Sequence, residues 1–151
     1  FKLTSVERYS EAPLWAGMAS ASGLIFEYAR QKHLPTGSPM PTGEEIFAAY
    51  NAGEPEAQKA LKIFARRVAV GILSLQNVLD VEKVAIGGGI SKQPILVETL
   101  NEVYEEYILR GHPFGAAAHT LPRPEIVPCR FLSEANQIGA FASYQKAFWE
   151  N

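Results

Sequence analysis

The stretch VAIGGGISKQP, residues 84–94, places three consecutive glycines between an apolar run and a segment with a helical pattern. The run that leads into it, VEKVAI, is short and rich in β-branched residues, which predicts a strand that ends at Gly87. A strand followed by a glycine turn and a helix presents main-chain N–H groups and the positive end of the helix at one edge of a sheet. Open α/β folds bind nucleotides at that edge.

Glycine lets a ligand lie on the main chain itself, because even one Cβ atom would fill the space that a purine, a ribose or a phosphate needs. Two common phosphate motifs do not fit. The dinucleotide fingerprint G-x-G-x-x-G has Lys92 in place of its last glycine, and a P-loop needs Gly-Lys-Ser or Gly-Lys-Thr where this chain has Ser91-Lys92-Gln93. A second interpretation is that the glycines serve only chain reversal or close packing of a helix on the sheet.

Composition limits the classes of protein to consider. The 151 residues are 47% hydrophobic, which is sufficient for one sizeable core. The net charge of -2 and the scattered Lys and Arg residues provide no basic surface for nucleic acid or an anionic membrane. The single cysteine, Cys129, excludes an internal disulfide and a cysteine zinc cage, which suits the cytoplasm. No long apolar stretch or signal peptide is present, and the strand-like start without an initiator Met suggests an excised domain.

Helical patterns fill the first half of the chain. One helix is predicted to begin at the Ser20 cap and another after Thr42, separated by the proline- and glycine-rich loop of residues 34–43. A long helix is predicted from Pro55, and its second half is apolar almost all round, so we expect it to be sandwiched in the domain, with Gly71 permitting a close approach. Its expected buried stripe comprises Leu61, Phe64, Val68, Ile72, Leu75 and Leu79.

The second half alternates strands and helices. A single helix is predicted over residues 90–110, a second strand over residues 125–131 with Pro128 at an edge or a bulge, and a last helix over residues 133–150. A short first strand is predicted over residues 1–6. This order predicts an α/β fold with parallel pairing around Val84.

Three segments resemble the ROK group (repressors, open reading frames and sugar kinases). LDVEKVAIGGGIS, residues 79–91, is similar to the adenosine-contacting segment of that group, in which a strand with this glycine triplet follows a long central helix. SEANQIGAFASYQKAF, residues 133–148, resembles the closing helix, which has an Asp/Glu-Ala-x-x-x-Gly-Ala pattern. ASASGLIFEYAR, residues 19–30, is similar to the Ala-Ser-x-x-x-Leu helix start. The segments occur in the family's order.

The resemblance implies an actin-like, ribonuclease-H-like ATPase fold in which two α/β lobes, with mixed sheets flanked by helices, close on ATP and a sugar. Residues 1–151 would form the C-terminal lobe, and the N-terminal lobe would lie outside this chain. The family's Asp-x-Gly-Gly-Thr phosphate turn and catalytic aspartate belong to that other lobe. Because Asp80 is the only aspartate here and no Asp-x-Gly-Gly occurs, no catalytic residue is expected in this chain.

The resemblance also implies the binding residues. Gly87, Gly88, Gly89, Ile90 and Ser91 would hold the adenosine part of ATP, with Mg²⁺ on the phosphates in the full-length protein. Many members carry a cysteine-rich zinc loop that ends in Gly-Cys-Leu-Glu, whose glutamate touches the sugar. The corresponding SEAPLWAGMAS has no cysteine and has alanine at the glutamate position, at residue 16, so no zinc is expected and that sugar contact is not carried over.

The function implied is that of an ATP-dependent sugar kinase, similar to glucokinase or β-glucoside kinase, which phosphorylates a hydroxyl of a hexose or related glycoside. The fragment alone is not expected to catalyse. The alternative is the sugar-sensing lobe of a ROK-type transcriptional repressor, which an upstream helix-turn-helix would distinguish. A third interpretation is a bare oligomerisation lobe, and a homodimer is expected. The substitution Gly88→Val is expected to weaken ATP binding with little loss of fold.

Other candidate residues have plainer interpretations. His112 and His119 flank an irregular loop without a carboxylate or cysteine at ligand spacing, which favours solvated side chains over a metal site. Cys129 has no activating histidine next to it in the sequence, which favours a buried apolar residue over a nucleophile.

Two further pairs of residues have more than one interpretation. Glu105 and Glu106 are adjacent on a predicted helix and would point about 100° apart, so an exposed face is expected rather than an acid and base pair. Trp15 and Trp149 suit either stacking on a sugar or purine, or anchoring a core or an interface.

Overall fold

A computed structural model of the chain describes residues 14–110 and 123–149. The predicted first strand and both loop histidines, His112 and His119, lie outside these ranges. The chain divides into two compact units, Phe1–Gly71 and Ile72–Asn151. The boundary falls within the longest helix, α4 (Pro55–Leu79).

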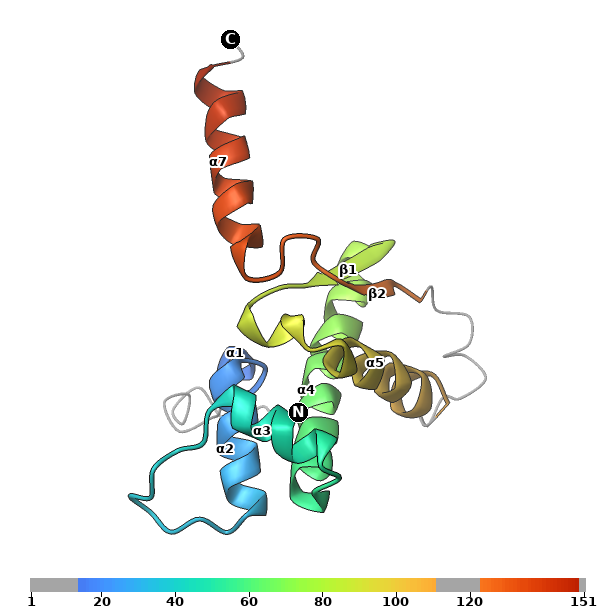
Figure 1. The fold of residues 1–151 in the computed structure, drawn as a ribbon. Helices are drawn as coiled ribbons and strands as arrows, with labels where there is room; N and C mark the ends of the chain where they lie inside the picture. Colours follow the sequence, from blue (N-terminus) through green and yellow to red (C-terminus); the bar gives the residue numbers. More distant parts are fainter. Residues whose placement is uncertain (1–13, 111–122, 150–151) are drawn as a thin grey trace, which may run out of the picture. The chain divides into compact units, whose positions relative to one another are not determined.

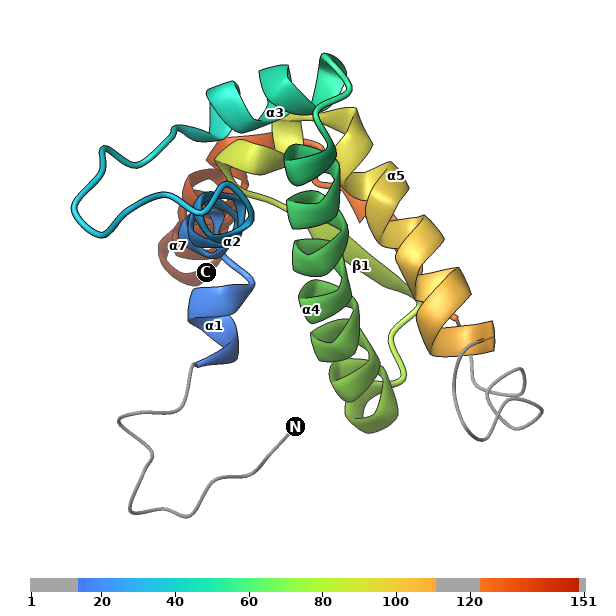
Figure 2. The same ribbon diagram turned by 90° about the horizontal axis from the view of Figure 1, so that it is seen from below.

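The first unit is helical in its described part. It contains α1 (Trp15–Met18), α2 (Ala21–Gln31), α3 (Gly43–Asn51) and the first part of α4 (Figure 2). Ser20 caps α2 as predicted, since its hydroxyl accepts a hydrogen bond from the Gly23 N–H at 3.3 Å. Thr42 and Glu45 form a capping box at the start of α3. The local start signals in the sequence therefore specify the helix boundaries.

The buried face of α4 depends on alanine more than the sequence pattern indicated. The predicted positions Leu61, Phe64 and Ile72 are buried, but Leu75 is 47% exposed and Leu79 is 60% exposed. The prediction of a sandwiched second half was wrong: the buried face passes through Ile72 and Gln76, Leu75 lies about 100° around the helix from Gln76, and Leu79 is the last residue of the helix. The alanines that complete the buried face are Ala57, Ala60, Ala65 and Ala69.

Gly71 permits a close approach, as predicted. The indole of Trp15 lies where a Cβ at position 71 would be, and its Nε1 donates a hydrogen bond to the Arg67 carbonyl at 2.8 Å. A side chain at this position would displace the ring. Trp15 therefore anchors α1 to α4.

A buried carboxylate joins α2 to α4. Glu27 is only 3% exposed, and its oxygens accept hydrogen bonds from Arg30 at 2.5 Å, Gln31 at 2.6 Å and Arg67 at 2.6 Å. Burial by itself raises the pKa of Glu27, but the three donors outweigh it and hold the pKa below the ordinary value. The ionised carboxylate is therefore part of the folded state.

Glu27→Gln should lower the free energy of unfolding by about 2 kcal/mol near pH 7, since hydrogen bonds to a charged group are lost. The folded pKa is lowered, so the contribution is complete above the unfolded pKa and is lost as the pH falls through the folded pKa. Urea unfolding near pH 7 and at about pH 3 should show the difference between wild type and variant shrinking in acid. Glu98→Gln, at an exposed carboxylate, is the matched control. Equal effects of the two substitutions near pH 7 would contradict this role.

The second unit is built on a parallel strand pair. β1 (Lys83–Ile86) pairs with β2 (Glu125–Pro128), with Lys83 opposite Glu125 and Ile86 opposite Pro128 (Figure 1). This confirms the predicted parallel pairing around Val84. The remaining elements are the 3₁₀ turn η2 (Gly89–Lys92), α5 (Pro94–Val103), the π-helical segment η3 (Tyr104–Arg110), the 3₁₀ turn η4 (Leu132–Glu134) and α7 (Ala135–Phe148).

The helix predicted over residues 90–110 is divided in the structure. Residues 89–92 form a 3₁₀ turn, Gln93 is extended, and α5 begins at Pro94. The residue before a proline favours extended backbone, and proline fits the first position of a helix, so the Gln93-Pro94 step sets the boundary. The prediction that Ile90 and Ser91 begin the helix was therefore wrong.

α5 packs on β2. The side-chain amide of Asn101 donates hydrogen bonds to the carbonyls of Val97 at 2.9 Å and Ile126 at 3.1 Å, which ties the helix to the strand. The buried apolar residues of this layer are Leu96, Val97, Leu100, Val103, Tyr104, Ile108, Leu109 and Ile126. None of the helices in the described ranges has the length and hydropathy to span a bilayer.

Candidate functional site

The glycine turn lies at the carboxyl ends of both strands. The N–H of Cys129 donates to the Ile86 carbonyl at 2.9 Å, and the N–H of Gly88 donates to the Leu132 carbonyl at 3.3 Å. The segment that follows β2 therefore lies beside the turn that follows β1. Carboxyl ends of parallel strands are where open α/β folds hold ligands, and the sequence placed the turn at this edge.

The three glycines have different roles. Gly88 has φ 92° and ψ 174°, a conformation that essentially only glycine adopts. A Cβ at Gly87 would make ordinary contacts with the Cys129 sulfur at 3.4 Å and the Leu132 carbonyl at 3.6 Å. At Gly88 and Gly89, no atom of the described residues lies within 4 Å of a Cβ position. Close packing of protein thus does not account for Gly89.

Ser91 supports the turn from inside. Its side chain is buried, at 3% exposure, and its hydroxyl donates to the Gly88 carbonyl at 2.7 Å. Its main-chain N–H bonds the same oxygen at 3.2 Å. Ile90 is half-buried, whereas Gly87, Gly88 and Gly89 are exposed. The five predicted residues therefore lie together, with the glycines forming the surface and Ser91 holding its shape.

The main chain of Gly88 offers no free N–H group to a phosphate. Both polar main-chain groups of Gly88 are engaged within the protein, the N–H with Leu132 and the carbonyl with Ser91. The sequence suggested that the positive end of a helix follows the glycines directly. In the structure α5 begins only at Pro94, so its positive end lies further along the chain. The exposed Cα atoms of Gly88 and Gly89 instead offer a smooth contact for a flat group.

The remaining candidates do not form a second site. Cys129 is half-buried beside Gly87, less enclosed than predicted. Glu105 accepts hydrogen bonds from Arg123 at 2.7 Å and Arg110 at 3.3 Å, so it is ion-paired rather than coupled to Glu106. Within residues 14–110 and 123–149, no group of three or more acidic, histidine or cysteine side chains could hold a metal ion.

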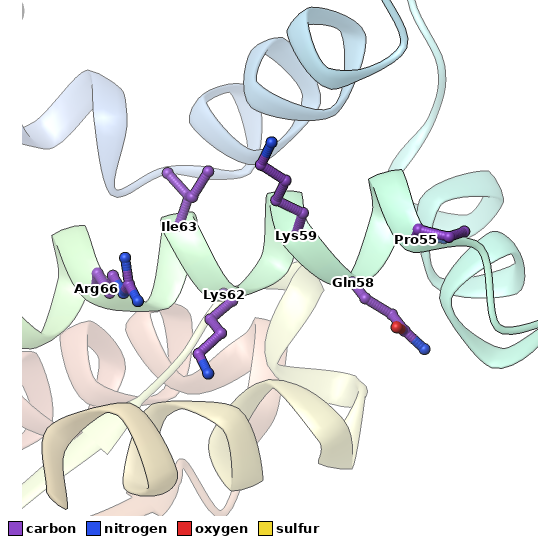
Figure 3. A pocket seen from close by; sticks show the side chains of 6 residues that line it. All are labelled: Pro55, Gln58, Lys59, Lys62, Ile63 and Arg66. Atoms are coloured by element: carbon purple, nitrogen blue, oxygen red, sulfur yellow. The ribbon is translucent and has the colours of Figure 1, made fainter. Parts of the chain in front are cut away.

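Sequence reasoning did not find two hollows in the first unit. One, of about 450 Å³, lies along α4, and Figure 3 shows the side chains of Lys59 and Lys62 pointing to different sides of the helix, so the two cations do not converge on one anion. Its lining residues are Pro55, Gln58, Lys59, Lys62, Ile63 and Arg66.

The second hollow, of about 360 Å³, borders the proline-rich loop and includes Tyr28 and Met40. The Tyr28 hydroxyl donates to Glu54 at 2.8 Å. Burial and this hydrogen bond raise the pKa of Tyr28 to about 12, so the phenol stays protonated near neutral pH. The prolines of the loop were the available signal, but they predict only a turn.

The family profile of the ROK family matches residues 15–147. The chain belongs to the ROK family. This confirms the resemblance carried by the glycine stretch, the early Ala-Ser helix and the closing helix.

Relatives and solved structures agree with this assignment. Beta-glucoside kinase of Listeria innocua is 33% identical over 92 residues, which are 60% of this chain and 31% of that protein. Beta-glucoside kinase of Klebsiella pneumoniae is 32% identical over 78 residues, 52% of this chain and 26% of that protein. The matched region thus spans about a third or less of these relatives.

Two ROK structures share the fold at 22% identity. A ROK family protein from Streptococcus pneumoniae in complex with sucrose gives a TM-score of 0.71 over 96% of this chain and 47% of that one. ROK hexokinase from Thermus thermophilus gives 0.64 over 87% of this chain and 41% of that one. These likenesses confirm the predicted α/β, actin-like ATPase fold.

The different roles of the glycines predict different costs of substitution. Gly88→Ala should lower the free energy of unfolding by about 1–3 kcal/mol, because alanine is strained in this backbone conformation. Gly89→Ala should change it by less than about 0.5 kcal/mol, since neither backbone nor neighbours oppose a Cβ. Urea unfolding of the two variants measures this. The same backbone strain would destabilise Gly88→Val, so that variant is a poor test of ATP binding. Equal losses of unfolding free energy at positions 88 and 89 would contradict the different roles given to the two glycines.

Proposed function

We propose that this chain is the nucleotide-binding C-terminal lobe of an ATP-dependent sugar kinase, which phosphorylates a hydroxyl of a hexose or a related glycoside. The observation that carries the proposal is the exposed surface without side chains at Gly88 and Gly89, at the carboxyl ends of β1 and β2. The relatives named as beta-glucoside kinases support this function over that of a repressor. Homodimer formation and a cytoplasmic location stay predictions.

The chain's own residues would bind and orient rather than react. The adenosine part of ATP would lie on the main chain of Gly88 and Gly89, while Ser91 keeps the turn in shape. When bound, ATP would supply the phosphoryl group, and Mg²⁺ would neutralise charge on its phosphates. Phosphoryl transfer depends mainly on positioning and on such neutralisation. The aspartate that removes the proton from the sugar hydroxyl would belong to a lobe that precedes residue 1, and no described side chain is assigned to the metal.

Gly89→Val in the full-length protein should raise the Kd for ATP at least about tenfold, equivalent to about 1.4 kcal/mol, because the side chain occupies the space proposed for the nucleoside. Gly17→Val is the matched control, since Gly17 is exposed and a Cβ there also meets no described atom within 4 Å. Calorimetric titration with a non-hydrolysable ATP analogue measures both. Equal affinities in the two variants would place the nucleotide elsewhere.

Activity distinguishes the kinase from other ROK proteins. ADP release is measured with the full-length protein, ATP and a panel containing glucose and β-glucosides, with ATP alone as the blank. Sugar-dependent ADP release supports the proposal. ATP binding that depends on residue 89 without phosphorylation of any sugar would retain the nucleotide site and overturn the kinase function.

A further inference from the structure

Leu132, the first residue of η4, has an unusual main-chain conformation. Its φ is 45°, in the left-handed region that residues with a Cβ normally avoid. Glycine, asparagine and aspartate are the residues that usually adopt it, whereas Leu132 carries a bulky apolar side chain that is half-buried. The conformation has a steric cost, which other contacts of the folded chain must outweigh.

The other non-glycine residues of positive φ in the described ranges have an ordinary reason for it. His33, with φ 52°, follows the C-cap of α2, and Asp80, with φ 48°, follows the last residue of α4. A left-handed residue commonly ends a helix in this way. Leu132 ends no helix, because the preceding element is β2 and η4 begins at this residue. Its conformation therefore needs another explanation.

Hydrogen bonds hold Leu132 on both sides. Its N–H donates to the Cys129 carbonyl at 3.1 Å, which closes the turn after β2. Its own carbonyl accepts from the Gly88 N–H at 3.3 Å. The same oxygen lies 3.6 Å from the position that a Cβ on Gly87 would take. With the N–H fixed on Cys129, rotation about φ decides the side to which the rest of Leu132 is directed, and the left-handed value directs its carbonyl to the glycine turn.

This contact joins two residues that are both in the left-handed range of φ. Gly88 has φ 92°, and its own carbonyl is held by the Ser91 hydroxyl at 2.7 Å. Leu132 holds the N–H of the same residue, so the two partners fix Gly88 at both of its polar groups. Strained backbone that persists in a folded protein gathers where a ligand is held.

We infer that Leu132 is a positioning residue for the glycine turn: its left-handed main chain, rather than its leucine side chain, holds Gly88 in the shape proposed to receive the nucleoside. Only the identity of the ligand rests on the proposed function. Leu132 acts through Gly88 and is assigned no contact with ATP or the sugar.

Two substitutions at position 132 separate the main chain from the side chain. Leu132→Gly removes the side chain but fits φ 45° without steric cost. Leu132→Ile keeps the apolar volume, but the branch at its Cβ opposes a positive φ. If the side chain is what matters, glycine is the worse replacement, and if the main chain is what matters, isoleucine is. Leu132→Asn and Leu132→Val are the second variants of each kind, in case one of the first pair does not fold.

Hydrogen exchange resolved to single residues in the full-length protein measures the Gly88 N–H directly. We expect this N–H to exchange at least about fivefold faster in Leu132→Ile than in Leu132→Gly, because isoleucine draws the carbonyl away from Gly88. Leu132→Gly should exchange no faster than the wild type. Phe131→Ile is the matched control, since Phe131 precedes Leu132 with an ordinary φ of -102°, and it should leave exchange at Gly88 unchanged.

Nucleotide affinity measures the consequence for the proposed site. In calorimetric titration with a non-hydrolysable ATP analogue, we expect a Kd for Leu132→Ile at least about threefold above that for Leu132→Gly. The KM for the sugar should be the same in both variants. A general loss of structure would raise both constants, so a change confined to the nucleotide identifies a positioning role.

Equal exchange at Gly88 in the two variants, or faster exchange in Leu132→Gly, would overturn the role of the main chain. The expected exchange order together with equal Kd values would overturn the positioning of the nucleotide. A wild-type protein that does not bind the analogue would instead end the proposed function. The exchange order would then still decide whether Leu132 positions the turn.

Discussion

The second unit depends on the main-chain conformation of one residue, Gly88. Its backbone angles are open essentially only to glycine, and they let the chain leave β1 and turn back into η2. In this conformation the Gly88 N–H reaches the Leu132 carbonyl, while its own carbonyl accepts hydrogen bonds from Ser91. The end of β1 is thereby joined to the segment after β2. The shape of the turn and its connection to η4 follow from this one constraint.

The first unit is held together by contacts of single side chains rather than by the conformation of a main-chain turn. Glu27 gathers donors from α2 and α4 around a buried charge, and the Trp15 indole fills the space that Gly71 leaves open. Both contacts are specific to single side chains, in contrast to the alanines that allow close packing along α4. A carboxylate with three donors is costly to rearrange, so it also fixes the orientation of α2 on α4.

The parts of the fold that the sequence predicted correctly are those with local causes. Ser20, Thr42 and Pro55 begin helices because capping and proline geometry act within one turn, and the glycine triplet marks the end of a strand. The helix boundary at Gln93-Pro94 also has a local cause, which is the effect of a proline on the residue before it. The prediction missed this boundary because the apolar periodicity continues on both sides of the proline. The exposed Leu75 and Leu79 could not be foreseen, because alanine and leucine compete for the buried side only in the tertiary structure.

The same distinction applies to the site. The glycines could be found from sequence, since their lack of side chains is itself the signal. The inward-pointing hydroxyl of Ser91 could not be predicted, because a serine after glycines is as typical of a ligand contact as of a hydrogen bond to the main chain. Glu27 was missed because a charged residue on a helix normally faces solvent, and only the packing of α2 on α4 brings Arg67 to it.

The proposed function requires a nucleoside to lie against the main chain of Gly88 and Gly89. The most direct measurement is a crystal structure of the full-length protein with a non-hydrolysable ATP analogue. We expect the adenine or ribose in van der Waals contact, at about 4 Å, with the main chain of these two glycines. A nucleotide bound elsewhere, with the turn covered by the protein's own side chains, would contradict this binding mode.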